Sequence, residues 1–97
     1  MINHVVCFKL KESTDESRLK AKEVLMGMKG NVPMMVDISV GTDFLHSARS
    51  YDVILQVKLE NRDMLDAYQN DPYHVDVVKK YMHQVVESSI AIDYDLD

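Results

Sequence analysis

The chain has 97 residues, the usual size of one domain, so a single domain over residues 1–97 is expected. Its 16 acidic and 11 basic residues give a net charge of −5 without any basic block, which argues against nucleic acid and anionic membranes as partners. No apolar run approaches the ~20 residues of a membrane-spanning helix, no signal-peptide pattern is visible, and the single cysteine, Cys7, allows no internal disulfide, so a cytoplasmic location is expected.

The first third of the chain predicts a strand followed by a helix. Residues 2–10 alternate between two faces and include β-branched side chains, which is typical of a strand. Ser13 and, three residues later, Glu16 have the pattern of a capping box, so a helix is expected to begin there with Ser13 as the N-cap. Apolar residues recur at helical spacing over residues 21–28, and Gly30 is expected to cap the end of the helix.

The middle of the chain predicts two strands and a short helix. Alternating apolar residues indicate strands over residues 34–41 and 51–60, joined by a polar loop over residues 42–50. Asn61 is expected to cap a short helix. Asp71 is followed by a proline suited to the first helical turn, so a second part of this helical region is expected to begin there, with Asp71 as its cap.

The remainder predicts a long amphipathic helix and a last strand. The helix stripe that faces the sheet is expected to consist of His74, Val78, Tyr81 and Val85. Alternation over residues 90–94 indicates the strand. The order βαββαβ is that of an α+β, ferredoxin-like fold, in which both helical regions cover one face of a four-stranded antiparallel sheet.

The other face of the predicted sheet is neither a core nor an ordinary polar surface. Its expected apolar members are Val5, Cys7, Met35, Ile54 and Ala91. Its expected polar members are Asn3, Asp37, Ser39, Gln56 and Lys58. A patch of this kind favours a partner surface, and a second copy across a two-fold axis is the simplest partner. The alternative is a single-layer sheet with scattered exposed apolar residues, which is common.

Three side chains could carry proton-transfer chemistry. His4 shares the strand face that is expected to meet the helices, His74 lies in the first turn after the proline, and Tyr68 lies near the end of the preceding helix. A neutral imidazole is a competent base near pH 7, and a phenol can donate a hydrogen bond to a developing oxyanion. The alternative is that each is a buried polar group satisfied by its neighbours.

The other reactive residue types are expected to have no catalytic role. His46 and His83 are expected to face solvent, and Cys7 is expected to fill space rather than act as a nucleophile. No His, Cys, Asp or Glu spacing is typical of a metal site, so neither a metal nor another cofactor is expected. The acidic end of the chain, residues 93–97, is expected to be solvated.

A set of short motifs follows a fixed order along the chain. They are His4-Val5-Val6, Phe8-Lys9, Gly30, Pro33, Tyr51-Asp52, Ala67-Tyr68, Asp71-Pro72, His74 and Ile92-Asp93-Tyr94. In this order and spacing the chain resembles, over essentially its whole length, the Dabb family of stress-responsive α/β-barrel domains. The resemblance implies a ferredoxin-like subunit that dimerises through its sheet into an α+β barrel.

The resemblance also implies several activities. Plant members include stress-associated and antimicrobial proteins, and a polyketide cyclase that closes a ring by aldol condensation. In that cyclase a Tyr and a His six residues later act together with a His near the start of the first strand, and Tyr68, His74 and His4 match these positions. A further pocket Tyr of the cyclase falls near Leu25, where this chain has no hydroxyl, so a different substrate is implied.

Some plant members of the family hold a magnesium ion through main-chain carbonyls after the first helix. The matching positions lie near Lys29, Val32 and Met35. Carbonyl ligands leave little signature in the side chains, so the sequence gives this site little weight.

Three functions therefore remain open. The first is a cofactor-free enzyme acting on a small carbonyl compound, with His74 as general base, Tyr68 polarising the carbonyl or orienting His74, and His4 hydrogen-bonding within the pocket. The second is a non-catalytic, stress-associated homodimer or a small-ligand-binding module. The third is a cofactor-independent oxygenase, which related dimeric barrels suggest.

Overall fold

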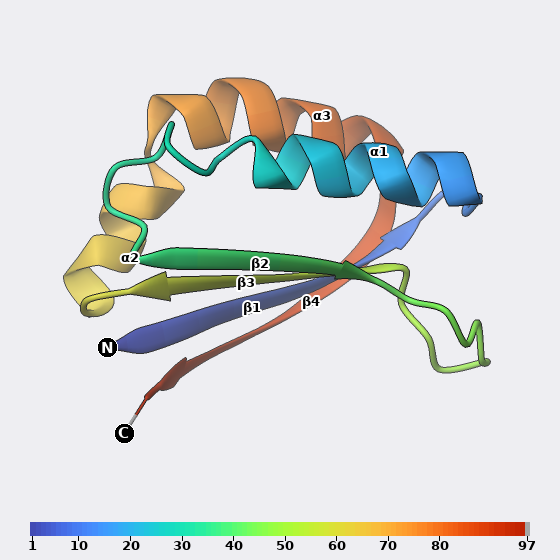
Figure 1. Cartoon of the computed structure of the whole chain (residues 1–97), viewed down its shortest axis with the longest axis horizontal. Helices are drawn as coiled ribbons and strands as arrows, with labels where there is room; N and C mark the ends of the chain where they lie inside the picture. Colours follow the sequence, from blue (N-terminus) through green and yellow to red (C-terminus); the bar gives the residue numbers. More distant parts are fainter. Residues whose placement is uncertain (97) are drawn as a thin grey trace.

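The computed structural model describes residues 1–96, which form a four-stranded antiparallel sheet with the helices on one face (Figure 1). The strands are β1 (Ile2–Leu10), β2 (Asp37–Thr42), β3 (Val53–Leu59) and β4 (Val86–Asp95). The helical elements are α1 (Asp15–Met26), α2 (Arg62–Gln69), the π-helical segment η1 (His74–Lys79) and α3 (Lys80–Val85). The order across the sheet is β2-β3-β1-β4, which confirms the predicted ferredoxin-like fold.

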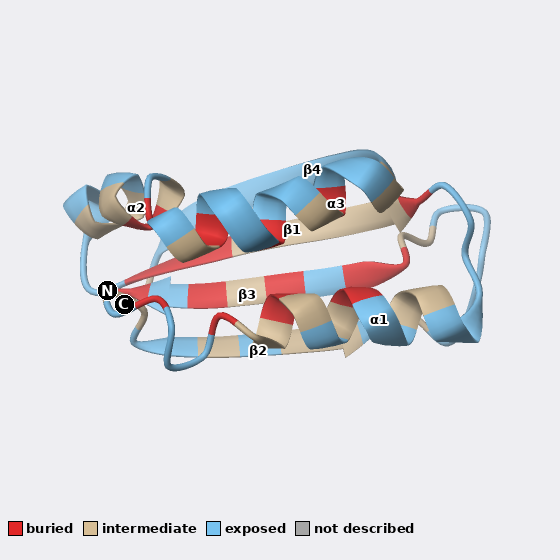
Figure 2. Cartoon of the chain, turned by 90° about the horizontal axis from the view of Figure 1, so that it is seen from above, coloured by how far each residue is buried: buried red, intermediate tan, exposed pale blue. Residues whose placement is uncertain are grey.

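The core lies between the helices and one face of the sheet. Alternate residues of β3 are buried and form its centre (Figure 2): Val53, Leu55, Val57 and Leu59. Leu25 of α1 and Val78 of η1 pack against this row from above. Because each such side chain contributes roughly 1.5–3 kcal/mol when buried, this face is the main source of stability.

The first helix begins one residue later than predicted. Thr14, not Ser13, is the N-cap: its side chain accepts a hydrogen bond from the Ser17 amide (3.0 Å), and the Ser17 hydroxyl accepts one from the Thr14 amide (2.8 Å). The expected partner Glu16 is therefore not used. Ser13 instead donates its hydroxyl to the Asp52 carboxylate (2.5 Å), which removes it from the cap.

The end of α1 also differs from the prediction. The helix ends at Met26, and Gly27 caps it by donating its amide to the Glu23 carbonyl (3.0 Å). A Cβ at Gly27 would lie 2.9 Å from the Tyr73 hydroxyl, so any larger residue there would displace the end of the Tyr73 side chain. Gly30, the predicted cap, lies in the following turn with φ of 83°, a conformation that glycine adopts most readily.

The open face of the sheet carries more apolar surface than predicted. Val5 of β1 pairs with Ile92, and Cys7 pairs with Ile90 and with Ile54 of β3. The β4 residues Ile90, Ile92 and Tyr94 lie on this face, with exposed fractions of 50%, 63% and 45%.

Two predicted members of the open face lie elsewhere. Ala91 pairs with Val6 and therefore lies on the face that carries the helices. Met35 precedes β2, which starts at Asp37 rather than at residue 34, and packs against the core from the connecting segment. The prediction placed Ala91 on the open face because the more apolar set of β4, Ile90, Ile92 and Tyr94, was expected to meet the helices, whereas its pairing with β1 turns that set to the open face.

The last helical region restarts at Asp71, as predicted. The Asp71 carboxylate accepts a hydrogen bond from the His74 amide (3.2 Å), and its carbonyl accepts one from the Val75 amide (2.9 Å). No helix within residues 1–96 is long and apolar enough to cross a lipid bilayer.

The π-helical segment η1 was not predicted. A π turn contains one more residue than an α turn, so it changes which side chains face the sheet beyond it. Val78 and Met82 are buried, whereas the predicted Tyr81 and Val85 are only partly buried. Only His74 and Val78 of the predicted stripe are fully buried.

A buried carboxylate connects the end of β1 to the loop before β3. The Asp52 side chain accepts hydrogen bonds from the Leu10 amide (2.8 Å) and the Ser13 hydroxyl, and the Asp52 amide donates to the Phe8 carbonyl (2.8 Å). Arg18 of α1 donates to the Ser13 hydroxyl (2.6 Å), so α1 joins the same network.

Replacing Asp52 by alanine is expected to lower the free energy of unfolding by about 2–4 kcal/mol, because the Leu10 amide would be left buried without a partner. Urea denaturation at pH 7 measures the effect. The exposed Asp76→Ala serves as the control and should change stability by less than about 0.5 kcal/mol. Equal stability of the two variants would show that this network is not a main stabilising contact.

Candidate functional site

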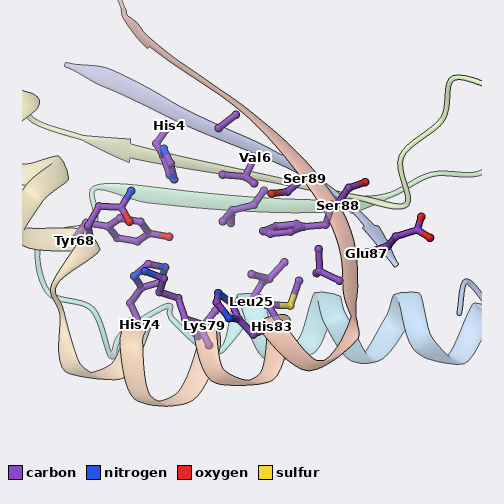
Figure 3. Close-up of a pocket in the computed structure, with 17 residues that line it drawn as sticks. His4, Val6, Leu25, Tyr68, His74, Lys79, His83, Glu87, Ser88 and Ser89 are labelled. Atoms are coloured by element: carbon purple, nitrogen blue, oxygen red, sulfur yellow. The ribbon is translucent and has the colours of Figure 1, made fainter. Parts of the chain in front are cut away.

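The structure brings the three predicted site residues together (Figure 3). His4 comes from β1, Tyr68 from the end of α2, and His74 from the start of η1. The Tyr68 ring meets the His4 ring edge-on, with centroids 5.5 Å apart and an interplanar angle of 61°. It stacks on the His74 ring at 4.4 Å and 26°. The phenol therefore lies between two imidazoles.

These three residues line one end of a pocket of about 520 Å³ between the sheet and the last helical region. Most of the wall is apolar and includes Val6, Phe8, Leu25, Leu55, Val78 and Met82. Exposed residues also line it, namely Lys79, His83, Glu87, Ser88 and Ser89. An apolar cavity of this size with a few convergent polar groups is typical of a small-molecule site.

Tyr68 is fully enclosed, with an exposed fraction of 0%. Its hydroxyl donates to the Met28 sulfur at 3.7 Å. Burial raises the pKa of Tyr68, so the phenol stays protonated at neutral pH. Because a thioether is a weak acceptor, the hydroxyl proton can turn to a better acceptor that enters the pocket.

The backbone amide of His74 donates a hydrogen bond to the Asp71 carboxylate, but one nitrogen of its ring has no partner in the described part of the chain. Within residues 1–96, Nδ1 of His74 is buried and makes no hydrogen bond. Burial lowers the pKa of His74, the backbone of Gln69 and of Tyr68 opposes this shift, and the positive charge of Lys79 adds to the effect of burial. The imidazole is therefore neutral at pH 7 and is available as a base. The stacked ring arrangement means that Tyr68 orients His74 by contact rather than by a hydrogen bond from its hydroxyl.

His4 is oriented by a residue that the sequence analysis did not select. Its Nδ1 forms a hydrogen bond with the Asp93 carboxylate, which lies opposite it in the β1–β4 ladder. Because a carboxylate accepts, Nδ1 of neutral His4 carries the proton and Nε2 is left as an acceptor. The acidic end is exposed at residues 93–95, as expected, and the side chain of Asp93 is 41% exposed, but its pairing with His4 was not predicted; Asp97 lies outside the described residues.

The register of the last strand was the missing signal for Asp93. Position 93 falls opposite position 4 only when β4 pairs with β1 in the observed register. Asp and His on directly opposite positions of neighbouring strands form a cross-strand pair. Such a pair could be found from the sequence once a strand order and register are assumed.

The remaining reactive residues lie away from the three rings. His46 is in the exposed loop between β2 and β3, as predicted. His83 is exposed as predicted, yet it also lines the pocket. Cys7 is half-buried on the open face, and burial raises the pKa of its thiol, so the unreactive protonated form is favoured.

No three His, Cys, Asp or Glu side chains of residues 1–96 lie close enough together to hold a metal ion. The carbonyl-bound magnesium implied after α1 is a separate matter and stays a prediction. One of its candidate ligands, the Val32 carbonyl, accepts a hydrogen bond from the Met35 amide (3.3 Å).

Comparison with known proteins gives a family and a set of structural relatives. The model of the stress responsive A/B barrel domain, Dabb, matches residues 2–96. A stress-response A/B barrel domain-containing protein of Arabidopsis thaliana is 27% identical over 100% of this chain. The chain spans 37% of the length of that curated relative.

Solved structures of low sequence identity share the fold. A dimeric protein of unknown function and ferredoxin-like fold from Bacteroides fragilis is 24% identical, with a TM-score of 0.81 over 98% of this chain and 95% of its own. A hydroxynitrile lyase from Passiflora edulis is 15% identical, with a TM-score of 0.77 over 99% of this chain and 93% of its own.

The lowered pKa of His74 predicts how stability changes with pH. The unfolded chain binds a proton at this histidine below about pH 6.5, whereas the folded chain binds it only at lower pH, so stability falls as pH decreases from 6.5 toward the folded pKa. Unfolding by urea at pH 7.5 and pH 5.5 should show a smaller loss for His74→Gln than for the wild type. An equal loss in both proteins would show that His74 is not held neutral by the fold.

Proposed function

Because the chain belongs to the Dabb family of stress-responsive A/B barrel domains, we propose that it is a cofactor-free enzyme acting on a small carbonyl compound. The observation that carries this proposal is the stacking of a neutral His74 on a protonated, enclosed Tyr68 at the end of a mainly apolar pocket. A base and a hydrogen-bond donor thus meet at the buried end of the pocket.

The proposed reaction begins with proton abstraction next to a carbonyl. The substrate carbonyl oxygen accepts a hydrogen bond from the Tyr68 hydroxyl, which leaves the Met28 sulfur. His74 takes a proton from the adjacent carbon, and the electrons of the broken C–H bond form an enolate whose charge lies on that oxygen. The enolate then attacks a second electrophilic carbon, as in an aldol step, or regains a proton from His74.

General base catalysis of this kind supplies about 10²–10⁴-fold in rate. A hydrogen bond to the developing oxyanion supplies about 10²–10³-fold more. Both contributions need the low polarity of the pocket wall, because water would compete for the Tyr68 proton and for the His74 lone pair.

His4 and Asp93 form the sheet side of the proposed site. The Asp93 carboxylate sets the His4 tautomer, which leaves Nε2 as an acceptor, and the His4 ring lies 5.5 Å from the Tyr68 ring between their centroids. His4 can therefore accept a proton from a substrate hydroxyl, while Asp93 acts as a positioning residue. The Passiflora relative, which is a hydroxynitrile lyase, supports the proposal that this fold can host an enzyme.

Deuterium incorporation tests the proton abstraction directly. The protein should catalyse exchange of the methyl protons of acetophenone in D₂O, followed by NMR. His74→Gln should slow this exchange about 10²–10⁴-fold and Tyr68→Phe about 10²–10³-fold, whereas the loop variant His46→Gln should leave it unchanged. Wild-type exchange rates in both pocket variants would contradict the assigned roles.

We further propose that the active form is a homodimer joined through the open sheet face. Exposed apolar side chains gather on β4 and continue to Ile54 of β3 and Val5 of β1, which makes a patch across three strands. The Bacteroides relative, which is a dimeric protein, supports this proposal. A second copy packed across a two-fold axis would bury the patch on both subunits.

A charge placed on the open face should dissociate this dimer. Ile92→Asp is expected to sediment as a monomer at micromolar concentration, because a buried unpaired carboxylate costs several kcal/mol. The control is Leu19→Asp on α1, which alters an equally apolar, exposed residue of the helix layer and should remain dimeric. A monomeric wild type at the same concentration would refute the proposal.

A non-catalytic, stress-associated dimer that binds a small apolar ligand is the second candidate. The mainly apolar wall and the complete enclosure of Tyr68 favour it. The deuterium experiment separates the two candidates, since a binding module would bind acetophenone without exchanging its protons.

A further inference from the structure

The pocket carries a cation that the proposed proton transfer does not use. Lys79 is the last residue of η1, is exposed, and lines the same pocket as His74. None of the ion pairs found within residues 1–96 includes Lys79. Its ammonium group is therefore available to a molecule that enters the pocket.

The π-helical segment brings Lys79 to the pocket side. His74 and Lys79 are five residues apart, which is the hydrogen-bond spacing of a π-helix. Residues at that spacing lie on the same side of a π turn, whereas in an α-helix, with 3.6 residues per turn, they would point in clearly different directions. His83, four residues beyond Lys79, continues the row along α3 and also lines the pocket.

The order of charges along the pocket is also informative. Lys79 and His83 lie between the His74–Tyr68 end and Glu87, which lies toward the opposite end (Figure 3). Glu87 is the only acidic residue among those that line the pocket. A short molecule whose carbonyl lies at Tyr68 would therefore have its other end near Lys79, whereas Glu87 would be farther away.

The charge on Lys79 acts on the proposed base. It adds to the effect of burial, which is the main cause of the lowered pKa of His74. An anion paired with Lys79 would cancel this influence and make His74 a stronger base. Binding and proton abstraction would therefore be coupled.

We propose that the pocket selects carbonyl compounds that carry a carboxylate, so that keto acids are its substrate class, with Lys79 holding the carboxylate. This inference rests on the proposed function for the identity of the carbonyl end, but its test measures binding. His83 adds a second donor beside Lys79, and the Ser88 and Ser89 hydroxyls add polar groups along β4.

A matched pair of ligands tests the inference. The keto acid 3-benzoylpropionate and its methyl ester share the aryl ketone and differ in the charge, and NMR titration measures the affinity of each. The wild type should bind the acid more tightly, and Lys79→Gln should weaken acid binding about fivefold while leaving ester binding unchanged, since a partly exposed ion pair contributes a factor of this order. Lys80→Gln is the control, because Lys80 is exposed but does not line the pocket.

Equal affinity of the acid for the wild type and Lys79→Gln would overturn the inference, as would tighter binding of the ester by the wild type. These outcomes leave the proposed proton transfer standing if acetophenone still exchanges its protons. Conversely, a charge-dependent affinity without any exchange would support the inference and count against the enzyme.

The ligand-free protein provides a second readout. The groups that face His74 are His4 from β1, Tyr68 from α2, Asp71 from the preceding turn and Lys79. Lys79→Gln should raise the pKa of His74, followed by NMR of its ring protons, and Lys80→Gln should leave it where it is. An unchanged pKa in Lys79→Gln would show that the ammonium does not stand close enough to serve the same ligand as His74.

Discussion

The pairing of β1 with both β3 and β4 is the constraint on which the rest of the structure depends. As a central strand, β1 has its backbone fixed on both sides, so its alternation assigns each side chain to one face. His4 thereby points to the helices and meets Asp93 from the neighbouring strand, while Val5 points the other way and joins the apolar patch of the open face. The candidate site and the proposed dimer surface are therefore set by a single register, because a slip of one residue would exchange the two faces.

The candidate site combines groups that burial keeps uncharged. Burial opposes ionisation of both Tyr68 and His74, and it leaves one as a donor and the other as an acceptor. The stacking of the two rings keeps the donor and the acceptor side by side. The carboxylate of Asp93 fixes the orientation of His4. A buried imidazole nitrogen without a partner is costly in a purely structural core. In the proposed function, a bound ligand supplies a partner for this nitrogen and removes that cost.

The sequence predicted those parts of the structure in which one local signal dominates. Period-two alternation located β1 and β3, and the Asn61 cap located the start of α2. Asp71 was chosen over its neighbour Asn70 because the proline after Asp71 suits the first turn of a helix. Ser13 and Thr14 are both good caps, and the choice depends on Asp52, which is close to Ser13 only after folding. Ala91 was assigned to the wrong face because the apolar side of β4 was expected to meet the helices, whereas its pairing with β1 turns that side to the open face. The convergence of His4, Tyr68 and His74 could be predicted from the fold alone. To predict the role of Asp93, the register of β4 against β1 must be known. To predict the π turn, the packing of the whole last helix must be known.

The π turn has a consequence for how such pockets could diverge. A π segment differs from an α-helix by a single additional residue, so loss of one codon between His74 and the last strand could restore the regular helix. The sheet, the first histidine and the stacked pair would survive, yet a different side chain would take the place of Lys79 beside the ligand. Selectivity in this architecture could thus change through a one-residue deletion, without replacement of any group that handles the proton.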